Sequence, residues 1–304
     1  MFKHLRLRLT ADFDTALQEY PQCFTEMYQR MLVRIPKHYV KIAQDMLRWI
    51  MVALRPLQLK ELSLALSIRE SDSNEASGRR PDFSEDDVSE VLGAFVKVEN
   101  GTVSTDHQSA REFFLRDSKG RVFLGESRSS DARQEEKLNR DTVISMHNKA
   151  AETCRKYLLF DQFDFASIEK IESHLQTVET LLKKHEFLQY ASSSVAAHYR
   201  RLSESLQVRD LFIRLLKAED AQFVLWLRLC FLPNTKDVVQ TRGWTALHSC
   251  AYFDLELTIG SILSLEEFLK AQKFGKWEID VPDSASFPPL HIAVSRFNKE
   301  IVKI

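Results

Sequence analysis

Residues 120–127, GRVFLGES, have the glycine spacing of a phosphate-binding loop, G-x-x-x-x-G-K-[ST]. The lysine that reaches the β- and γ-phosphates in such a loop is replaced here by Glu126, whose carboxylate would repel them. The segment also follows a predicted helix and precedes a charged stretch, whereas a phosphate-binding loop joins a strand to a helix. We therefore predict that this chain has no phosphate-binding loop and no cofactor of its own.

Three histidines are the other candidates for chemistry. His248 and His291 lie in similar short motifs, but no cysteine or carboxylate accompanies them at the spacing of metal ligands. There is no G-x-S-x-G nucleophile elbow either. His107 stands alone between a predicted strand and a predicted helix, where its simplest role is to bond a carbonyl group or the helix start. These patterns predict no catalytic residue and no metal site, so we do not expect an enzyme.

Composition excludes several other classes of function. The 304 residues can form two or three domains, and the net charge of −1 gives no electrostatic reason to bind nucleic acid or anionic lipid. No window is apolar enough to span a membrane, and the start has no secretory signal. The cysteines are far apart and lie in apolar helical contexts, which predicts buried thiols in a reducing, cytoplasmic compartment. They are Cys23, Cys154, Cys230 and Cys250.

The elements that would position these residues begin with a winged helix over residues 37–120. Apolar stripes at helical spacing predict three helices between Phe24 and Leu66, with Trp49 buried on the second. Arg55-Pro56 ends the second helix. A helix over residues 84–92 follows, then two alternating runs joined by Asn100-Gly101, which predicts a β-hairpin as the wing. Ser109 is expected to cap the next helix.

Acidic residues on the helix over residues 84–92 argue against DNA binding, because that helix is the candidate recognition helix and carries no basic residue. Its acidic residues are Glu85, Asp86, Asp87 and Glu90.

Beyond the winged helix, the sequence predicts a flexible linker, a helical linker domain and a pair of repeats. Residues 121–140 are polar and charged, which is typical of a flexible connection. Residues 141–235 carry apolar positions at helical spacing. Residues 236–304 contain GWTALHSCA (Gly243–Ala251) and PPLHIAV (Pro288–Val294), both similar to the ankyrin pattern. The predicted fold is therefore mainly α: a winged-helix module with a small β-hairpin, a helical linker and incomplete ankyrin-type repeats.

Several ordered motifs together resemble a known family. YQRMLVRIP (Tyr28–Pro36), WIMVALRPLQLKEL (Trp49–Leu62) and HQSAREFFL (His107–Leu115) resemble the region after the nucleotide-binding domain in fungal NACHT–ankyrin proteins, which are NLR-like STAND signalling ATPases. The resemblance implies that residues 1–36 are the tail of a truncated NACHT helical region. It also implies that both ends of the chain are cut, so that the sequence is a fragment.

The resemblance assigns each part a role. The winged helix would couple an upstream NACHT domain to an ankyrin sensor array, and His107 would sense nucleotide only in the full-length parent. The array would bind a protein ligand. An alternative is an accessory segment of a larger enzyme with an upstream hydrolase-type effector domain.

Trp277, with Lys273 and Lys276 beside it, is the candidate contact in a stretch inserted between the two repeats, because an aromatic residue with a polar rim is typical of binding hot spots. The alternative is that Trp277 folds back to cover a helix over residues 263–268.

Overall fold

The computed structural model describes residues 24–69, 71–75, 81–93, 95–127, 129–163, 175–202, 220–231, 243–256, 258–259 and 281–303. These residues form two compact units, each built from two stretches of chain. The first combines the described residues up to Met51 with Glu85–Asn139, and the second combines Val52–Ser84 with the described residues from Arg140 onward. The sequence analysis predicts domains that follow one another along the chain and does not predict this division. The predicted domain boundaries stay predictions.

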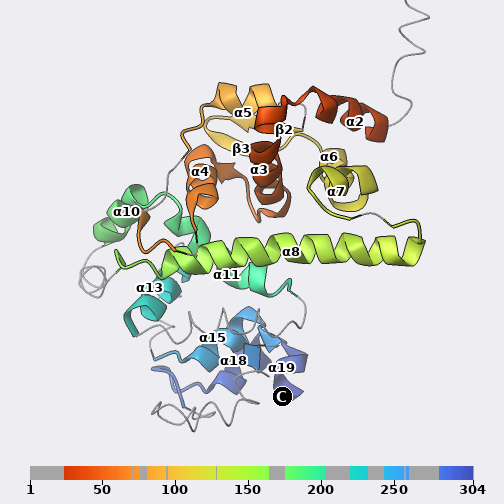
Figure 1. Cartoon of the computed structure of the whole chain (residues 1–304). Helices are drawn as coiled ribbons and strands as arrows, with labels where there is room; N and C mark the ends of the chain where they lie inside the picture. Colours follow the sequence, from red (N-terminus) through yellow and green to blue (C-terminus); the bar gives the residue numbers. More distant parts are fainter. Residues whose placement is uncertain are drawn as a thin grey trace, which may run out of the picture. The chain divides into compact units, whose positions relative to one another are not determined.

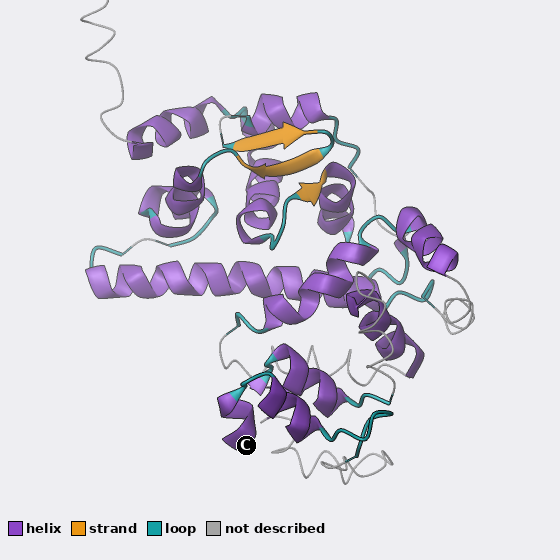
Figure 2. Cartoon of the chain, turned by 180° about the vertical axis from the view of Figure 1, so that it is seen from behind, coloured by secondary structure: helices purple, strands orange, loops and turns teal. Residues whose placement is uncertain are grey.

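The fold is mainly α with one small hairpin, as predicted (Figure 2). The first unit contains the hairpin and the elements near it along the chain (Figure 1). They are α2 (Phe24–Arg34), the 3₁₀ helix Lys37–Tyr39, α3 (Val40–Val52), α5 (Glu85–Leu92), β2 (Val96–Glu99), β3 (Thr102–Thr105), α6 (Gln108–Arg116), α7 (Ser118–Phe123) and the start of α8 (Ala132–Leu158).

The hairpin forms where Asn100-Gly101 predicts it. β2 pairs antiparallel with β3, with Val96 opposite Thr105 and Glu99 opposite Thr102. Asn100 and Gly101 have φ angles of 52° and 72°, the left-handed pair that a tight two-residue hairpin turn requires. The predicted wing is therefore confirmed.

Aromatic side chains form the core beside the hairpin. The ring of Tyr28 on α2 lies 5.8 Å from Phe95 and 5.3 Å from Phe113. Phe114 packs edge-on against both phenylalanines at 5.2 Å. Trp49 on α3 is buried, as predicted. Residues 24–34, which lie in the interval predicted as a tail, thus contribute Tyr28 to the core of the first unit.

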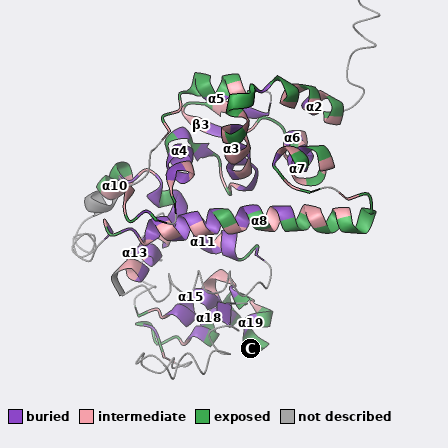
Figure 3. Cartoon of the chain, viewed as in Figure 1, coloured by how far each residue is buried: buried purple, intermediate pink, exposed green. Residues whose placement is uncertain are grey.

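Residues 121–140 differ from the predicted flexible linker. They contain the end of α7 and the first turns of α8, whose exposed start is visible in Figure 3. The Arg121 side chain is buried and forms an ion pair with Glu135. Glu135 also accepts the backbone N–H of Ser129 at 2.9 Å, which fixes the approach to α8. The interval is polar because this part of α8 faces solvent, a composition that a helix surface shares with a loop.

The second unit contains the remaining helices. They are α4 (Leu59–Ser67), preceded by the two-residue strand β1 (Leu57–Gln58), the rest of α8, α10 (Leu175–Lys184), α11 (Leu188–Tyr199), α13 (Asp220–Phe231), α15 (Ala246–Phe253), α18 (Pro289–Ser295) and α19 (Lys299–Lys303). Tyr157 on α8 centres its core, with Phe160, Phe163 and Phe187 at 5.2–5.3 Å. α13 packs on α11, where Trp226 Nε1 donates to the carbonyl of Ser192 at 3.0 Å.

Candidate functional site

His107 is the N-cap of α6. Its Nδ1 accepts the backbone N–H of Ser109 at 3.1 Å, so His107 takes the capping place predicted for Ser109. The Ser109 hydroxyl lies 2.8 Å from His107 Nδ1 and 2.8 Å from the Tyr28 hydroxyl. The exposed His107 ring also stacks on Phe24 at 6.4 Å. His107 therefore bonds a helix start, and its contact with a nucleotide in a full-length parent stays a prediction.

Gly120 serves packing rather than phosphate binding. It lies inside α7, so the segment that imitates a phosphate-binding loop begins as a helix. A Cβ atom at this position would lie 2.2 Å from the carbonyl oxygen of Phe113. Glycine is needed here because the α6 backbone approaches α7 closely.

His248 is a buried structural residue. Its Nδ1 accepts the backbone N–H of Thr245 at 3.0 Å, and its Nε2 donates to the carbonyl of Phe287 at 3.0 Å. Burial lowers the pKa of His248, although the Phe287 carbonyl and Asp283 favour the protonated form. His291 is exposed and stacks on Phe287 at 4.3 Å. The two histidines therefore do not come together as a site.

Replacing His248 with alanine is expected to lower the free energy of unfolding of the second unit by about 2 kcal/mol, because it leaves the partly buried Thr245 N–H without its partner and removes one of the two hydrogen bonds to the Phe287 carbonyl. Hydrogen exchange of α15 measures the loss locally. His291→Ala, in the same motif but exposed, is the control and should change stability by less than about 0.5 kcal/mol. Equal losses in both variants would contradict the structural role of His248.

Trp277, Lys273 and Lys276, the predicted contact residues, lie outside the described residues. Among the residues with described positions, no group of three or more His, Cys, Asp or Glu side chains could hold a metal ion. No helix in the described part of the chain is long and apolar enough to cross a membrane.

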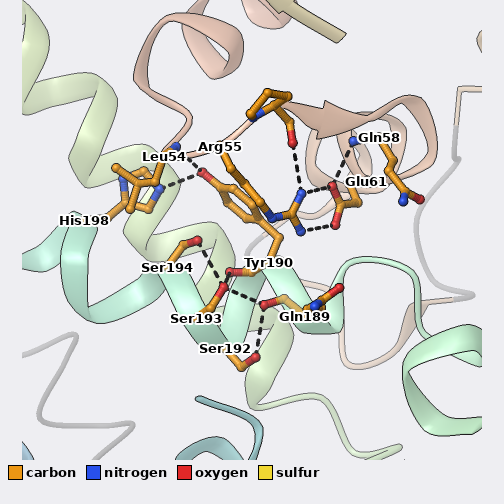
Figure 4. A network of polar contacts seen from close by, with 11 residues as sticks. Leu54, Arg55, Gln58, Glu61, Gln189, Tyr190, Ser192, Ser193, Ser194 and His198 are labelled. Atoms are coloured by element: carbon orange, nitrogen blue, oxygen red, sulfur yellow. Dashed lines mark hydrogen bonds and ion pairs between the residues drawn. The ribbon is translucent and has the colours of Figure 1, made fainter. Parts of the chain in front are cut away.

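A polar cluster that was not predicted lies in the second unit (Figure 4). Arg55 donates to both carboxylate oxygens of Glu61, at 2.8 and 2.5 Å, and also to the carbonyl of Pro56 at 3.0 Å. Glu61 further accepts the backbone N–H of Gln58 at 2.9 Å, which caps the start of α4. The Glu61 side chain is 3% exposed, whereas that of Arg55 is 37% exposed. Arg55 therefore neutralises a buried carboxylate.

Tyr190 extends this cluster to α11. The Arg55 guanidinium lies over the Tyr190 ring, 5.1 Å from its centre, within the range of a cation–π contact. The Tyr190 hydroxyl accepts the N–H of Leu54 at 3.4 Å and lies 3.0 Å from His198 Nε2. His198 Nδ1 in turn lies 2.8 Å from Nδ1 of His147 on α8. We call this set of residues the Arg55 network; its members are Leu54, Arg55, Glu61, His147, Tyr190 and His198.

A second cluster holds the loop that follows α4. Glu75 accepts hydrogen bonds from the Tyr157 hydroxyl and from His185 Nδ1, the latter at 3.0 Å. Its backbone N–H donates to the side chain of Gln162 at 3.0 Å. Burial alone would raise the pKa of Glu75, but the bonds from His185 and Tyr157 outweigh it and lower the pKa. Glu75 therefore stays charged and attached near neutral pH.

The sequence analysis singled out residues at only one end of the Arg55 network and none of the second cluster. Arg55, Pro56 and Glu61 belong to the motif quoted above, but Tyr190, His198 and Glu75 carried no signal that set them apart. Chemically, the clusters hold segments together: they contain buried acid, base and phenol groups in mutual hydrogen bonds, with no activated nucleophile among them.

Comparison with known families identifies the N-terminal part. A profile of the winged helix domain of GPI inositol-deacylase matches residues 28–124, about a third of the chain. This match supports the winged helix predicted over residues 37–120 and adds the second half of α2 to it. No curated protein and no solved structure matches the chain.

Proposed function

We propose that this chain is a non-enzymatic regulatory and protein–protein interaction module. In it, the winged-helix segment 52–75 is coupled to the helices that lead to the C-terminal pair of repeats. The Arg55 network carries this proposal, because it joins a segment inside the winged-helix match to α8 and α11. The second cluster, around Glu75, supports this proposal because the bond from Tyr157 to Glu75 attaches the same segment to α8 at another point.

The larger protein that we propose is an NLR-like STAND signalling protein of the fungal NACHT–ankyrin type. In this cytoplasmic protein the winged helix would report the nucleotide state of an upstream NACHT domain to the repeats. His107 would be the residue that senses the nucleotide. The shared turn geometry of the two repeat motifs supports the ankyrin assignment. Asp254 and Phe297 each lie six residues after the histidine of their motif, His248 or His291, and have φ angles of 57° and 59°.

A protein is the partner we propose for the repeats. Nucleic acid is a poor alternative, because the acidic residues of α5 are exposed and would repel phosphates. A membrane partner is equally disfavoured by the net charge of −1.

A second candidate function is an accessory segment of a larger hydrolase. The name of the matched domain favours it, since that winged helix belongs to GPI inositol-deacylase. The coding sequence upstream of Met1 distinguishes the two candidates: a G-x-x-x-x-G-K-[ST] loop would support the signalling protein, and a hydrolase domain would support the accessory segment. In both cases the winged helix acts as a regulatory connection.

The coupling is tested by Tyr190→Phe in the full chain at pH 7.5. Loss of the hydroxyl leaves the Leu54 N–H and His198 Nε2 without their bond, so exchange should accelerate about tenfold in residues 54–66 as well as in residues 188–199. Hydrogen exchange read by mass spectrometry measures both. Ser193→Ala, on the exposed side of the same helix, is the matched control. Acceleration confined to residues 188–199 would contradict the coupling.

A further inference from the structure

Three buried side chains in the Arg55 network form a continuous hydrogen-bonded row from Tyr190 through His198 to His147. Tyr190 and His198 are fully buried, and His147 is 4% exposed. The Leu54 N–H lies at one end of the row, so the row begins in the winged-helix segment and ends in α8. All of these residues belong to the second unit.

Proton positions along this row are restricted by its geometry. A hydrogen bond between two Nδ1 atoms needs one N–H and one lone pair, so only one of the facing Nδ1 atoms of His147 and His198 carries a proton. With Nε2 of His198 unprotonated, the Tyr190 hydroxyl donates to it and can accept from Leu54. When His198 already carries its proton on Nδ1, a further proton on Nε2 forces the Tyr190 hydroxyl to turn and places a positive charge in the core.

Charges around the row disfavour this extra proton. The cationic side chains on the surrounding elements include Arg55 over the Tyr190 ring, Arg155 on α8, Arg201 after α11, and Arg228 on α13, the helix that packs on α11. The carboxylates there are Glu61, which is bound by Arg55, and Glu152, which accepts from Asn148 at 3.1 Å. Cys154 is neutral, because burial raises the pKa of its thiol.

Burial, followed by the neighbouring His147 and Arg201, lowers the pKa of His198 to about 3. The ordinary pKa of histidine is about 6.5. We call the structure with His198 buried the closed state, and a state in which His198 is exposed to solvent the opened state. At a pH between these two pKa values, His198 binds a proton in the opened state but not in the closed state. Opening therefore becomes more favourable as the pH falls below about 6.5.

We propose that the row Tyr190–His198–His147 is a pH-sensitive latch: acidification releases the winged-helix segment 52–67 from α11. The latch rests on the coupling proposed above and adds its regulation. Glu75, whose pKa is lowered, keeps its charge over the same pH range.

The test measures hydrogen exchange of the full chain at pH 7.5 and 5.5, corrected for intrinsic exchange rates. For one proton, the opening constant of residues 54–66 and 188–199 should rise about tenfold, while that of the hairpin residues 96–105 should not. His198→Gln keeps hydrogen-bonding capacity but cannot be protonated, so it should abolish the rise. His107→Gln, at an exposed histidine, should retain it.

A wild-type ratio near one, or a tenfold rise that persists in His198→Gln, would overturn the latch. If that variant does not fold, NMR titration of the wild type decides: all nine histidine signals titrating near pH 6.5 would also overturn it. Tyr190→Phe at pH 7.5 tests the coupling separately. Coupling at pH 7.5 with no pH response would contradict the latch alone.

Discussion

Replacing Trp49 with alanine is expected to lower the free energy of unfolding by about 3–5 kcal/mol, the range for truncating a large aromatic side chain in a core. Trp49 is only 6% exposed, and it shares α3 with the buried residues Ala43, Met46, Leu47 and Ile50. Truncation would leave a cavity, and α3 could close it only by a shift that disrupts the packing of its other buried residues. Chemical denaturation followed by circular dichroism measures the change, because tryptophan fluorescence is itself altered by the substitution.

Val33→Ala on α2 is the control for this experiment, because Val33 is 86% exposed. It should change stability by less than about 0.5 kcal/mol. A loss below about 1 kcal/mol in Trp49→Ala would mean that α3 does not organise the core around this residue. A structure of the variant in which α3 keeps its position over an empty cavity would agree with the expected loss.

The winged helix could be predicted because its signals are local. Asn100-Gly101 specifies its turn through backbone conformation alone, and the apolar spacing of α3 specifies its buried face. Pro56 marks the end of the preceding helix for an equally local reason. Each of these features can be recognised within about a dozen residues, and the structure contains each of them.

The linker over residues 121–140 could not be predicted in the same way. Its polar composition agrees with both a loop and an exposed helix, and the choice depends on the ion pair between Arg121 and Glu135. Buried arginine is unusual, so nothing in the composition indicates that Arg121 lies inside. The predicted Ser109 cap of α6 was wrong because histidine is a rarer N-cap than serine, although a bond to the helix start was the simplest role expected for His107.

The Arg55 network could not be predicted either, because its parts are distant in sequence. Leu54 and Tyr190 are separated by 136 positions, and α11 shows no pattern that identifies Tyr190 as a partner of Arg55. Histidines in an apolar stretch are usually counted as core residues. That His147 and His198 face each other through their Nδ1 atoms follows only from how α8 and α11 pack.

The last prediction concerns the centre of that network. Replacing Arg55 with methionine is expected to lower the free energy of unfolding by about 3 kcal/mol, the lower end of the range for breaking a buried ion pair, because Arg55 is still partly in water. The loss arises chiefly from Glu61, whose carboxylate would stay buried with only the Gln58 N–H as a partner. Methionine keeps most of the side-chain volume, so packing against Tyr190 changes little.

The double variant Arg55→Met/Glu61→Leu should regain most of this loss, because replacing a whole buried pair with apolar side chains is often neutral. About 1 kcal/mol should stay lost, since Glu61 also caps α4. Lys41→Met breaks the exposed pair with Asp45, where Lys41 is 75% exposed, and should cost less than about 0.5 kcal/mol. Arg55→Met no more harmful than Lys41→Met, or a double variant no better than the single one, would show that the network is not held together by its buried carboxylate.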